Sequence, residues 1–575
     1  MADLVIALSV MFVTAGVLLI VANHFGFSPI PFYILAGLLA GPVITGDLFG
    51  PPMVDQQELL ELAQWGIAFL VFVFGIRVDF GDIQSVFRDA EVAAATQLLV
   101  VGSIAFAVGY GFSILFGFEY ALRNAIYFSA AATLSSTLVG AGVLEQEIRS
   151  NLVHGRLASS IHFFDDVVAI VVILILSAET LADPQIVTSN IGYGTLFLIA
   201  GLLMYQHGFP LLVRAADGFE ELILMGSISI LIAFLAAAEL AGISIVIGAF
   251  AAGIAIRNDG AQALGVQNGI ESIKDFFVAI FFVTVGALVQ IPTFEVLVLA
   301  AALLGLALVV SPAVHLLAFL YEGYDARTAF YASSSLNQMS ELALVIAIQA
   351  WLLGTIADGL FDAIILATAA TMIITVIARQ YEEQVYRSVV ERLVRGQQTR
   401  RIDEHSRVAD DLEHHVVVVG YGRQGRLLVD KLEHLEQPYV VIENDPVLRD
   451  DLERECRNYV FGDAMGSYPM ERTKLSDAAL LVSTVDHRPL SEHLLDLETD
   501  ADVILRSSSS GTARQLLDDG ATFVNVPNVL ASDQLVHNVK RVLEDESEVD
   551  ALKDEHMDVL VDLERHGFST RFDRI

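Results

Sequence analysis

The chain has 575 residues, of which 54% are hydrophobic and 18% charged, and its mean hydropathy is +0.59. Soluble proteins are about one quarter charged, so this composition predicts a polytopic membrane protein. The net charge of −36 argues against nucleic acid and anionic lipid headgroups as partners, and the single cysteine, Cys456, excludes a disulfide scaffold and a cysteine-based metal site.

Charged residues are distributed unevenly along the chain. Residues 1–378 contain 9 Lys/Arg and 29 Asp/Glu, whereas residues 379–575 contain 24 and 40, which predicts a soluble domain after the membrane part. The 5 lysines stand beside 28 arginines, and acids outnumber bases in both parts. Such a halophile-like composition is similar to that of proteins from cells with a very salty cytoplasm.

The membrane part contains thirteen apolar segments, which we predict to be membrane helices. The first is predicted to be a span and not a signal peptide, because no basic residue precedes it and no small-residue cleavage site follows it. The segments are residues 3–23, 28–46, 59–76, 92–116, 121–143, 156–177, 189–212, 221–238, 242–256, 275–290, 294–320, 327–352 and 357–378.

The sparse basic residues predict the orientation of these spans. With thirteen spans and a cytoplasmic C-terminal domain, the N-terminus lies outside, and Arg123 is the one basic residue of the membrane part on the outer side. We therefore predict a multi-pass protein of the cell membrane. The basic residues then placed at cytoplasmic loops or span ends are Arg77, Arg88, Arg149, Arg156, Arg214, Arg257, Lys274 and Arg327.

Three acids lie well inside predicted spans, where burying a charge costs several kcal/mol. Asp165 and Asp166 are adjacent in the sixth segment, and Glu341 lies in the twelfth. A single buried acid can serve as a structural hydrogen-bond partner, but two adjacent carboxylates favour a proton-exchanging site. His162 lies one turn before Asp166 and could face it, although a histidine hydrogen-bonded within the bundle is the favoured interpretation.

Two spans carry polar patches without charge. The fifth segment contains hydroxyl residues over 129–137, and the twelfth contains the run Ser-Ser-Ser-Leu-Asn-Gln-Met-Ser over 333–340. Ordinary packing of small residues is one explanation of such patches. Their matched placement around the aspartate pair favours an inverted-repeat transporter in which two helices break in mid-membrane and cross at an ion site.

The motifs FFDD, ATLSST and SELALVI resemble the cation:proton antiporter-2 family, and especially Kef-type potassium/proton antiporters with a fused nucleotide-binding regulatory domain. The resemblance covers about residues 1–535. It implies a sodium/proton-antiporter-like helical fold in which a six-helix core and a panel or dimer domain alternate access, normally in a homodimer. The chain is expected to be a transporter and not an enzyme.

The resemblance also implies roles for individual residues. Asp166 matches the aspartate that binds cation and proton in turn, and Asp165 matches a variable position that is Gln in Kef-type members and Asp in electrogenic sodium/proton members. The eleventh segment lacks the lysine that pairs with the first aspartate in those electrogenic relatives; Pro312 and His315 are its unusual residues. The remaining predicted members of the ion site are Thr133, Ser135, Ser136, Asn337, Gln338, Ser340 and Glu341.

The soluble part begins with a charged helical linker over residues 379–412. The sequence VVVVGYGRQG follows, in which three glycines form G-x-G-x-x-G after a strand and before a helix. Such glycines permit a tight turn and the close approach of backbone to phosphate at a helix N-terminus. Further short apolar strands are predicted within residues 438–445, 461–464, 479–486 and 502–507.

This order of elements resembles the RCK or KTN (TrkA-N-like) regulatory domain, which we predict over residues 413–540. Glu443 ends the second strand and could accept hydrogen bonds from ribose hydroxyls, which favours NAD(H), AMP or another adenosine nucleotide over NADP. The resemblance places Asp463 near the base and Arg423 near phosphate. The predicted phosphate-binding glycines are Gly420, Gly422 and Gly425, and the acidic tail over residues 541–575 has no predicted role.

Two other classes of function are considered. A nucleotide-gated potassium channel would need a carbonyl selectivity filter, whereas a buried aspartate pair favours alternating access. A membrane oxidoreductase would need a second redox centre, and the sequence shows no cysteine cluster, haem-ligating histidine pair or flavin fingerprint. The nucleotide is therefore expected to be an effector. Potassium is favoured over sodium by the regulatory domain, whereas the aspartate pair is similar to that of sodium exchangers.

Overall fold

The structure is a computed structural model, and it describes residues 2–44, 56–77, 90–149, 152–176, 184–217, 219–256, 263–544, 549, 551–554 and 556–557. The chain forms two compact units. A helical unit comprises Met1–Ile148, His154–Glu322 and Thr328–Ser388, and a second, α/β unit comprises Arg149–Val153, Gly323–Arg327 and Val389–Ile575. Each unit is considered by itself.

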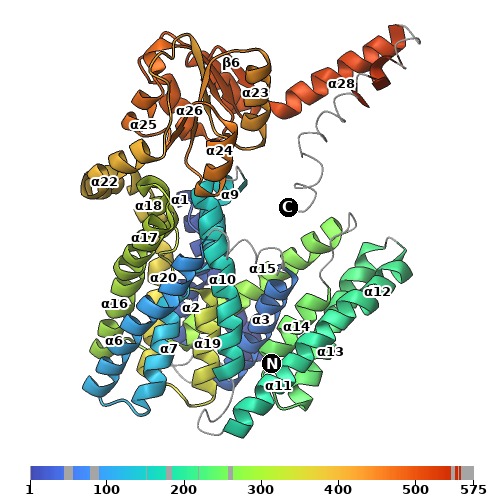
Figure 1. Cartoon of the computed structure of the whole chain (residues 1–575). Helices are drawn as coiled ribbons and strands as arrows, with labels where there is room; N and C mark the ends of the chain where they lie inside the picture. Colours follow the sequence, from blue (N-terminus) through green and yellow to red (C-terminus); the bar gives the residue numbers. More distant parts are fainter. Residues whose placement is uncertain are drawn as a thin grey trace. The chain divides into compact units, whose positions relative to one another are not determined.

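Every one of the thirteen predicted apolar segments contains helix (Figure 1). Among the described residues, seven helical segments are long and apolar enough to cross a membrane. The number of thirteen crossings stays a prediction. The helices are α1 (Ala2–Phe25), α2 (Pro29–Ile44), α3 (Gln56–Arg77), α5 (Glu91–Thr96), α6 (Gly102–Leu115), α7 (Ala121–Thr133), α8 (Thr137–Val143), α9 (Glu145–Arg149), α10 (Val153–Leu176), α11 (Pro184–Leu203), α12 (Phe209–Ala216), α13 (Glu220–Leu240), α14 (Ile245–Ala255), α15 (Ala263–Leu288), α16 (Phe294–Gly305), α17 (Ser311–Glu322), α18 (Ala326–Ser334), α19 (Glu341–Leu352) and α20 (Asp358–Arg379).

Three of these long helices are continued through a π-helical turn. These turns are η1 (Gln97–Val101) between α5 and α6, η2 (Met204–Gly208) between α11 and α12, and η3 (Leu306–Val310) between α16 and α17. A π-turn inserts one residue into the hydrogen-bond ladder and rotates the side chains that follow it, and such turns are frequent at functional sites.

Two of the predicted cytoplasmic basic residues, Arg88 and Arg257, lie outside the described residues.

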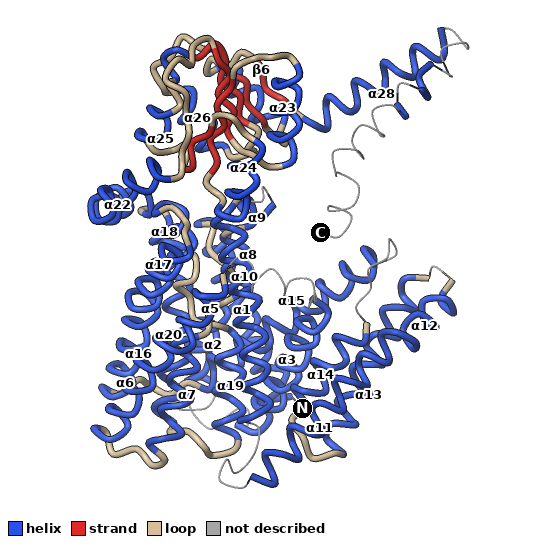
Figure 2. The backbone as a smooth tube through the Cα atoms, in the orientation of Figure 1, coloured by secondary structure: helices blue, strands red, loops and turns tan. Residues whose placement is uncertain are grey.

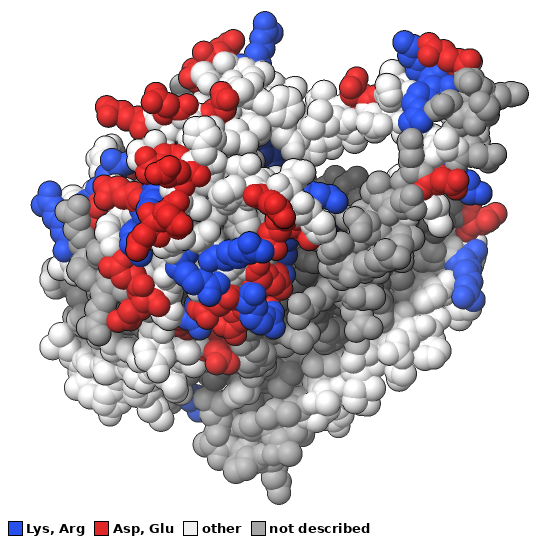
Figure 3. All heavy atoms as spheres, turned by 45° about the horizontal axis from the view of Figure 1, so that its top comes forward, with Lys and Arg blue, Asp and Glu red and all other residues white. Residues whose placement is uncertain are grey.

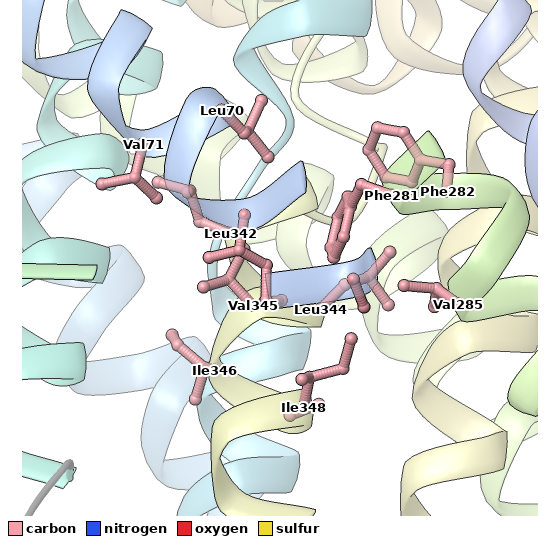
Figure 4. Packing of buried hydrophobic residues seen from close by; sticks show 14 of the residues in the cluster. Leu70, Val71, Phe281, Phe282, Val285, Leu342, Leu344, Val345, Ile346 and Ile348 are labelled. Atoms are coloured by element: carbon pink, nitrogen blue, oxygen red, sulfur yellow. The ribbon is translucent and has the colours of Figure 1, made fainter. Parts of the chain in front are cut away.

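The core of the helical unit is formed by apolar side chains that meet from several helices. In Figure 4, Leu70 of α3 and Phe281 of α15 lie in one cluster with Leu342 and Leu344 of α19. The helix α19 is buried from Glu341 to Ile348, as expected for a helix whose side chains are apolar on nearly all sides. The backbones of α2 and α15 also approach closely, because a Cβ atom added at Gly37 would lie 1.9 Å from the carbonyl oxygen of Val283.

The α/β unit contains a six-stranded sheet in the order β3-β2-β1-β4-β5-β6, with all neighbouring strands parallel (Figure 2). Strand order reverses between β1 and β4, where doubly wound sheets bind their ligands. The third strand was predicted too late in the chain, because residues 461–464 share only Phe461 with the observed strand Tyr459–Phe461, and β6 was not predicted from the sequence. The strands are β1 (His415–Val419), β2 (Tyr439–Glu443), β3 (Tyr459–Phe461), β4 (Ala478–Ser483), β5 (Asp502–Arg506) and β6 (Phe523–Asn525).

Short helices connect these strands and precede them. The predicted linker is helical over α21 (Glu382–Val385), the π-turn η4 (Tyr386–Val390) and α22 (Glu391–Glu404). After the sheet, the helix α28 (Pro527–Glu544) buries none of its residues fully. Much of the predicted tail 541–575 lies outside the described residues. The helices of the α/β domain are α23 (Arg423–His434), α24 (Arg449–Glu455), α25 (Ser467–Arg472), α26 (Arg488–Leu495) and α27 (Ser510–Asp518).

Charged side chains gather on part of the surface. In the view of Figure 3, Asp and Glu lie beside Lys and Arg in the upper and central region, and the described residues along the lower left edge are almost free of both. A surface without charge is expected where helices face hydrocarbon, since a lipid-exposed charge has no compensating solvent.

Candidate functional site

Two helices of the helical unit are broken in their middle and cross. The segment predicted as the fifth span is split into α7 and α8 by residues 134–136, and the segment predicted as the twelfth is split into α18 and α19 by residues 335–340. Ser135 and Met339 pair as an antiparallel bridge between the two breaks. The predicted pair of broken, crossing helices is therefore present in the structure.

Backbone hydrogen bonds hold the two breaks together. The N–H of Ser136 donates to the carbonyl oxygen of Gln338 at 3.0 Å, and the N–H of Ser340 donates to the carbonyl oxygen of Leu134 at 3.0 Å. Buried backbone groups released by a helix break need such partners, because no water is available in a membrane interior. Each break thus supplies the hydrogen-bond partners that the other lacks.

The crossing also brings two helix N-termini to one place. Ser136 and Ser340 are the N-caps of α8 and α19, and each hydroxyl accepts a backbone N–H of its own helix, at 3.3 and 3.0 Å. Glu341 accepts the backbone N–H of Leu138 through Oε1 at 3.1 Å, so an acid of α19 contacts the first turn of α8. The positive ends of two helix dipoles are favourable surroundings for negative charge.

Asp165 lies on α10 next to this crossing and is 1% exposed. Its Oδ1 accepts a hydrogen bond from Nε2 of Gln97 at 2.7 Å. Its Oδ2 accepts from the backbone N–H of Ser135 at 2.8 Å and from the hydroxyl of Ser135 at 2.5 Å. Three donors converge on one carboxylate, an arrangement that stabilises the ionised form in a buried position.

Asp166 faces a different partner. Its Oδ1 accepts a hydrogen bond from the hydroxyl of Thr137, the first residue of α8, at 2.9 Å, and Asp166 is 8% exposed. Successive side chains on a helix point about 100° apart. Asp165 consequently contacts the break itself, whereas Asp166 contacts the N-terminus of the helix that follows the break. The two carboxylates thus contact residues of the same short stretch, Ser135 and Thr137.

His162 is hydrogen-bonded within the bundle, which agrees with the favoured interpretation of the sequence. Its Nδ1 lies 3.0 Å from the hydroxyl of Ser135, the same hydroxyl that bonds Asp165. The ring packs against α8 so closely that a Cβ atom added at Gly140 would lie 2.2 Å from Nε2 of His162. The absence of a side chain at Gly140 therefore makes room for the histidine.

The other predicted members of the ion site are distributed around the crossing. The hydroxyl of Thr133 donates to the carbonyl oxygen of Ser129 at 2.7 Å, so it is bonded within its own helix. The amide nitrogen of Gln338 donates to the carbonyl oxygens of Ser335 and Ser136, at 2.9 and 3.3 Å. Asn337 is half-buried, and its Oδ1 has no hydrogen-bond partner among the described residues.

Gln97 belongs to this site but was not predicted from the sequence. This residue is the first of the π-turn η1, is 0% exposed, and donates to the carbonyl oxygen of Thr133 at 2.6 Å as well as to Asp165. Its Oε1 lies 3.2 Å from Nε2 of His315, which follows the π-turn η3 by five residues. The only sequence signal for Gln97 was its polar amide at the start of the apolar run QLLVV. A polar side chain that is buried there needs hydrogen-bond partners.

The α/β unit carries the second candidate site, at the glycine turn after β1. Gly420 has φ +92, in the left-handed region that favours glycine, and a Cβ atom at Gly425 would lie 2.0 Å from the carbonyl oxygen of Gly420. A Cβ atom at Gly422 would meet nothing within 4 Å, so the backbone there is open to a ligand. The predicted helix is present as α23, but it begins directly after Gly422 and already contains Gly425, whereas the sequence placed its start at Gly425.

Glu443 lies at the end of β2, beside this turn. Its Oε2 accepts the backbone N–H of Tyr421 at 2.6 Å, and its Oε1 accepts those of Asn444 and Asp445 at 2.8 and 2.9 Å. Burial raises the pKa of the Glu443 carboxyl, and the nearby Asp445 raises it further. In this structure both carboxylate oxygens therefore hold the loops that surround the predicted nucleotide site.

The remaining predicted nucleotide residues lie at the same edge of the sheet. Arg423 is exposed at the first position of α23. Asp463 follows β3, and its Oδ1 accepts the backbone N–H of Met465 at 2.9 Å. The carboxyl ends of β1, β2 and β3 thus bring the glycine turn, Glu443 and Asp463 to one edge, beside the point where the strand order reverses.

Comparison with known families divides the chain in the same way. Residues 8–380 match the family described as sodium/hydrogen exchanger, transmembrane, and residues 416–527 match the TrkA-N domain. The first match covers most of the helical unit and more than half of the chain. The second covers the parallel sheet of the α/β unit from Val416 in β1 to the end of β6.

Several known proteins are similar over most of their length. The putative cation/proton antiporter YbaL of Escherichia coli K12 is 27% identical over 82% of this chain and 85% of that protein. The putative K(+) efflux antiporter KefB of Alkalimonas amylolytica is 26% identical over 89% of this chain and 77% of that protein. The sodium proton antiporter MjNhaP1 of Methanocaldococcus jannaschii, a solved structure, is 15% identical, with a TM-score of 0.49 over 69% of this chain and 98% of that chain.

Proposed function

Because the chain belongs to the sodium/hydrogen exchanger family, we propose that it exchanges a monovalent cation, with potassium favoured, for protons across the membrane by alternating access. The protein is a transporter and not an enzyme. The observation that carries the proposal is the position of Asp165 and Asp166 at the crossing of two broken helices. Discontinuous helices at such a crossing offer backbone and side-chain oxygens to a cation and an anionic group to a proton.

Within this site Asp166 is the group that binds cation and proton in turn. Asp165 receives three donors from Gln97 and Ser135, which support its negative charge. Asp166 lies at the N-terminus of α8, where the helix dipole stabilises a carboxylate after its proton leaves. A cation that binds there replaces the proton as the balancing charge, and competition between the two couples their movements. The hydroxyl and carbonyl oxygens of the two breaks complete the cation site.

Potassium is favoured by the relatives, one of which is named a K(+) efflux antiporter. The aspartate pair supports sodium as the alternative, because the resemblance associates two adjacent aspartates with sodium/proton exchange. A nucleotide-gated potassium channel is the alternative of another class. It would dissipate a potassium gradient without moving protons, so that measuring both ions separates it from an exchanger.

The α/β unit is proposed to bind NAD(H), AMP or another adenosine nucleotide and to change the transport rate without consuming it. The glycine turn supports this proposal, since Gly422 leaves the backbone open at the start of α23. An effector changes transport when its affinity differs between transport states. Glu443 would serve the nucleotide indirectly in the observed conformation, by holding the N–H groups of the loops around it.

The proposed organisation assigns residues 1–378 to the exchanger, 379–412 to the linker, 413–540 to the regulatory domain and 541–575 to the tail. The proposed location is the plasma membrane, with the N-terminus outside and the regulatory domain in the cytoplasm. The distribution of basic residues supports this orientation. The proposed homodimer is supported by the family resemblance.

Transport is tested with the purified full-length protein in proteoliposomes that contain a pH-sensitive dye. A gradient of K⁺, Na⁺, Rb⁺ or choline is imposed, and the proposal predicts proton flux with K⁺ and none with choline. Asp166→Asn is expected to abolish the flux. Asp362→Asn is the matched control, because Asp362 is also a buried acid of the helical unit, 6% exposed on α20, and should retain the flux. Cation flux without proton flux in the wild type would contradict exchange.

Nucleotide binding is tested separately, by thermal unfolding of the detergent-purified protein. A ligand of the folded state raises stability by RT ln(1 + [L]/Kd), so NAD⁺, NADH, AMP, ADP and ATP are compared at equal concentration. Gly422→Asp places negative charge against the proposed phosphate position and should remove the shift. No shift with any of the five nucleotides at millimolar concentration would contradict the regulatory part of the proposal.

A further inference from the structure

The side-chain amide of Gln97 has one orientation that its neighbours permit. Its Nε2 lies 2.6 Å from the carbonyl oxygen of Thr133 and 2.7 Å from Oδ1 of Asp165. Both neighbours are acceptors, and the two hydrogens of the amide nitrogen satisfy both. Turning the amide over would bring two oxygens together at the Thr133 position. The Oε1 atom of Gln97 is consequently fixed on the side of His315.

This orientation of the Gln97 amide determines the protonation of one ring nitrogen of His315, Nε2. Nε2 of His315 lies 3.2 Å from Oε1 of Gln97, and an amide oxygen can accept but not donate. Nε2 therefore carries a hydrogen in every state of the ring that keeps this contact. The chain of contacts runs from His315 through Gln97 to the carboxylate of Asp165, and all three residues are at most 1% exposed.

The other ring nitrogen of His315, Nδ1, can be either unprotonated or protonated. Nδ1 of His315 lies 2.9 Å from the carbonyl oxygen of Ser311 and 3.3 Å from the hydroxyl oxygen of the same residue. A neutral ring can accept at Nδ1 from the hydroxyl, and a cationic ring can donate at Nδ1 to the carbonyl. His315 can thus gain or lose a proton without leaving either ring nitrogen unpartnered, which is uncommon for a fully buried ionisable group.

The charges around His315 are few. Among the described residues, the elements packed most extensively against α17 are α5, η1 and η3, of which α5 carries Glu91 and the two π-turns carry no ionisable side chain. On α17 itself, Tyr321 is exposed, and Glu322 lies two turns from His315 and accepts backbone N–H groups of α5. On α10, Asp165 is bonded to Gln97, and His162 is bonded to the Ser135 hydroxyl that also bonds Asp165. The carboxylate reached by the shortest hydrogen-bonded route is that of Asp165.

We propose that His315 is a proton-dependent positioning residue for Asp165, on which it acts through Gln97. A cationic ring polarises the Gln97 amide and strengthens its N–H donation to the Asp165 carboxylate, whereas a neutral ring donates more weakly. Protonation of His315 thereby favours the state in which both aspartates can be charged. This inference rests on the proposed exchange at the aspartate pair, and it assigns a role to a segment that has no lysine.

The test is the pH profile of cation-driven proton flux in proteoliposomes. His315→Gln can keep a contact with Gln97 but cannot take up a proton, so one ionisation should disappear from the profile. Ser311→Ala removes the hydroxyl that serves the neutral ring and leaves the carbonyl that serves the cationic ring. Ser311→Ala should therefore shift the part of the pH profile that reflects the ionisation of His315 to higher pH. The expected shift is about one pH unit or less, for the loss of a single hydrogen bond.

Ser113→Ala is the matched control. Ser113 is a buried serine of α6 whose hydroxyl donates to the carbonyl oxygen of Gly109 at 2.8 Å, and no described histidine bonds it. It should leave the pH profile unchanged. If His315→Gln and Ser311→Ala change the rate but both keep the wild-type pH profile, His315 has a structural role and the inference is overturned, while the exchange itself stands.

A second measurement does not depend on transport. The thermal unfolding midpoint of the purified wild type and of His315→Gln is followed over the pH range in which imidazole titrates, and the difference between the two midpoints should change with pH. Parallel curves would overturn the inference. If the wild type exchanges no cation, the proposed function fails. The unfolding curves then still test whether His315 gains or loses a proton in the folded protein. Should His315→Gln not fold, Ser311→Ala replaces it in both measurements.

Discussion

The carboxylate of Glu341 accepts the backbone N–H of Leu138 at 3.1 Å, so an acid of one broken helix caps the first turn of the other. The two residues are separated by 203 positions in the chain. This contact and the backbone hydrogen bonds between the two breaks join the broken helices into one structural unit. A displacement of one broken helix therefore also displaces the other.

Removing this cap should destabilise the crossing. Glu341→Ala leaves the Leu138 N–H without its acceptor in a buried place, and the loss of such a cap costs about 1–2 kcal/mol. Glu341→Gln keeps a carbonyl oxygen and should cost less. Thermal unfolding in detergent measures both. The control is Glu295→Ala, an exposed acid in the first turn of α16, which should have a smaller effect. An equal effect of Glu295→Ala would contradict the capping role.

The packing of His162 against α8 gives a second prediction. A methyl group at Gly140 would lie 2.2 Å from Nε2 of His162 and 2.7 Å from Nε2 of Gln338, so Gly140→Ala should force both side chains to move. Overpacking of a buried site typically costs about 1–3 kcal/mol. A Cβ atom at Gly142, two residues further along the same helix and on a different face, would meet nothing within 4 Å. Gly142→Ala should therefore leave transport and unfolding unchanged, and a similar loss in both variants would exclude this explanation.

Asp165→Asn tests whether the first aspartate contributes charge to the cycle. An asparagine can still accept from Ser135 or Gln97, so the fold should persist. If the negative charge of Asp165 takes part in exchange, the variant should move a different number of charges per turnover. Proton flux is compared at imposed membrane potentials of either sign. An unchanged voltage dependence would restrict Asp165 to holding the broken helix.

The single cysteine provides a pH-dependent probe of the α/β unit. Cys456 is 2% exposed, and burial raises the pKa of its thiol from 9.0 to about 11. The pKa of the thiol is higher in the folded than in the unfolded protein. The stabilisation of the folded state by the neutral thiol is therefore complete below pH 9 and is lost as the pH rises through about 11. Alkylation by iodoacetamide at pH 8 should be slow in the native protein and fast in denaturant. Fast alkylation of the native protein would contradict this burial.

Much of the arrangement follows from local sequence signals. The apolar runs predicted helices because hydrocarbon leaves the backbone few alternatives, and the glycine spacing predicted the turn before α23 because bulkier side chains do not fit there. The adjacent aspartates and the two hydroxyl-rich patches identified the crossing, since buried charge and broken helices both need polar partners.

Other features depend on long-range packing and were not predictable in this way. Gln97 and His315 are single polar residues in apolar runs, and their positions relative to Asp165 depend on how α5, α10 and α17 pack and on two π-turns. The strand β6 is three residues long, too short for its pattern to be distinguished. Glu443 was expected to face a ribose, but its backbone partners come from loops whose path the sequence does not specify.

The central claim is that one carboxylate, Asp166, binds a cation and a proton in turn. It is tested most directly by adding K⁺ or Na⁺ to the weakly buffered, purified protein and measuring proton release together with cation binding. The account predicts that cation binding releases protons in the wild type and that Asp166→Asn abolishes both the binding and the release. Cation binding without proton release in the wild type, or wild-type proton release from Asp166→Asn, would contradict it.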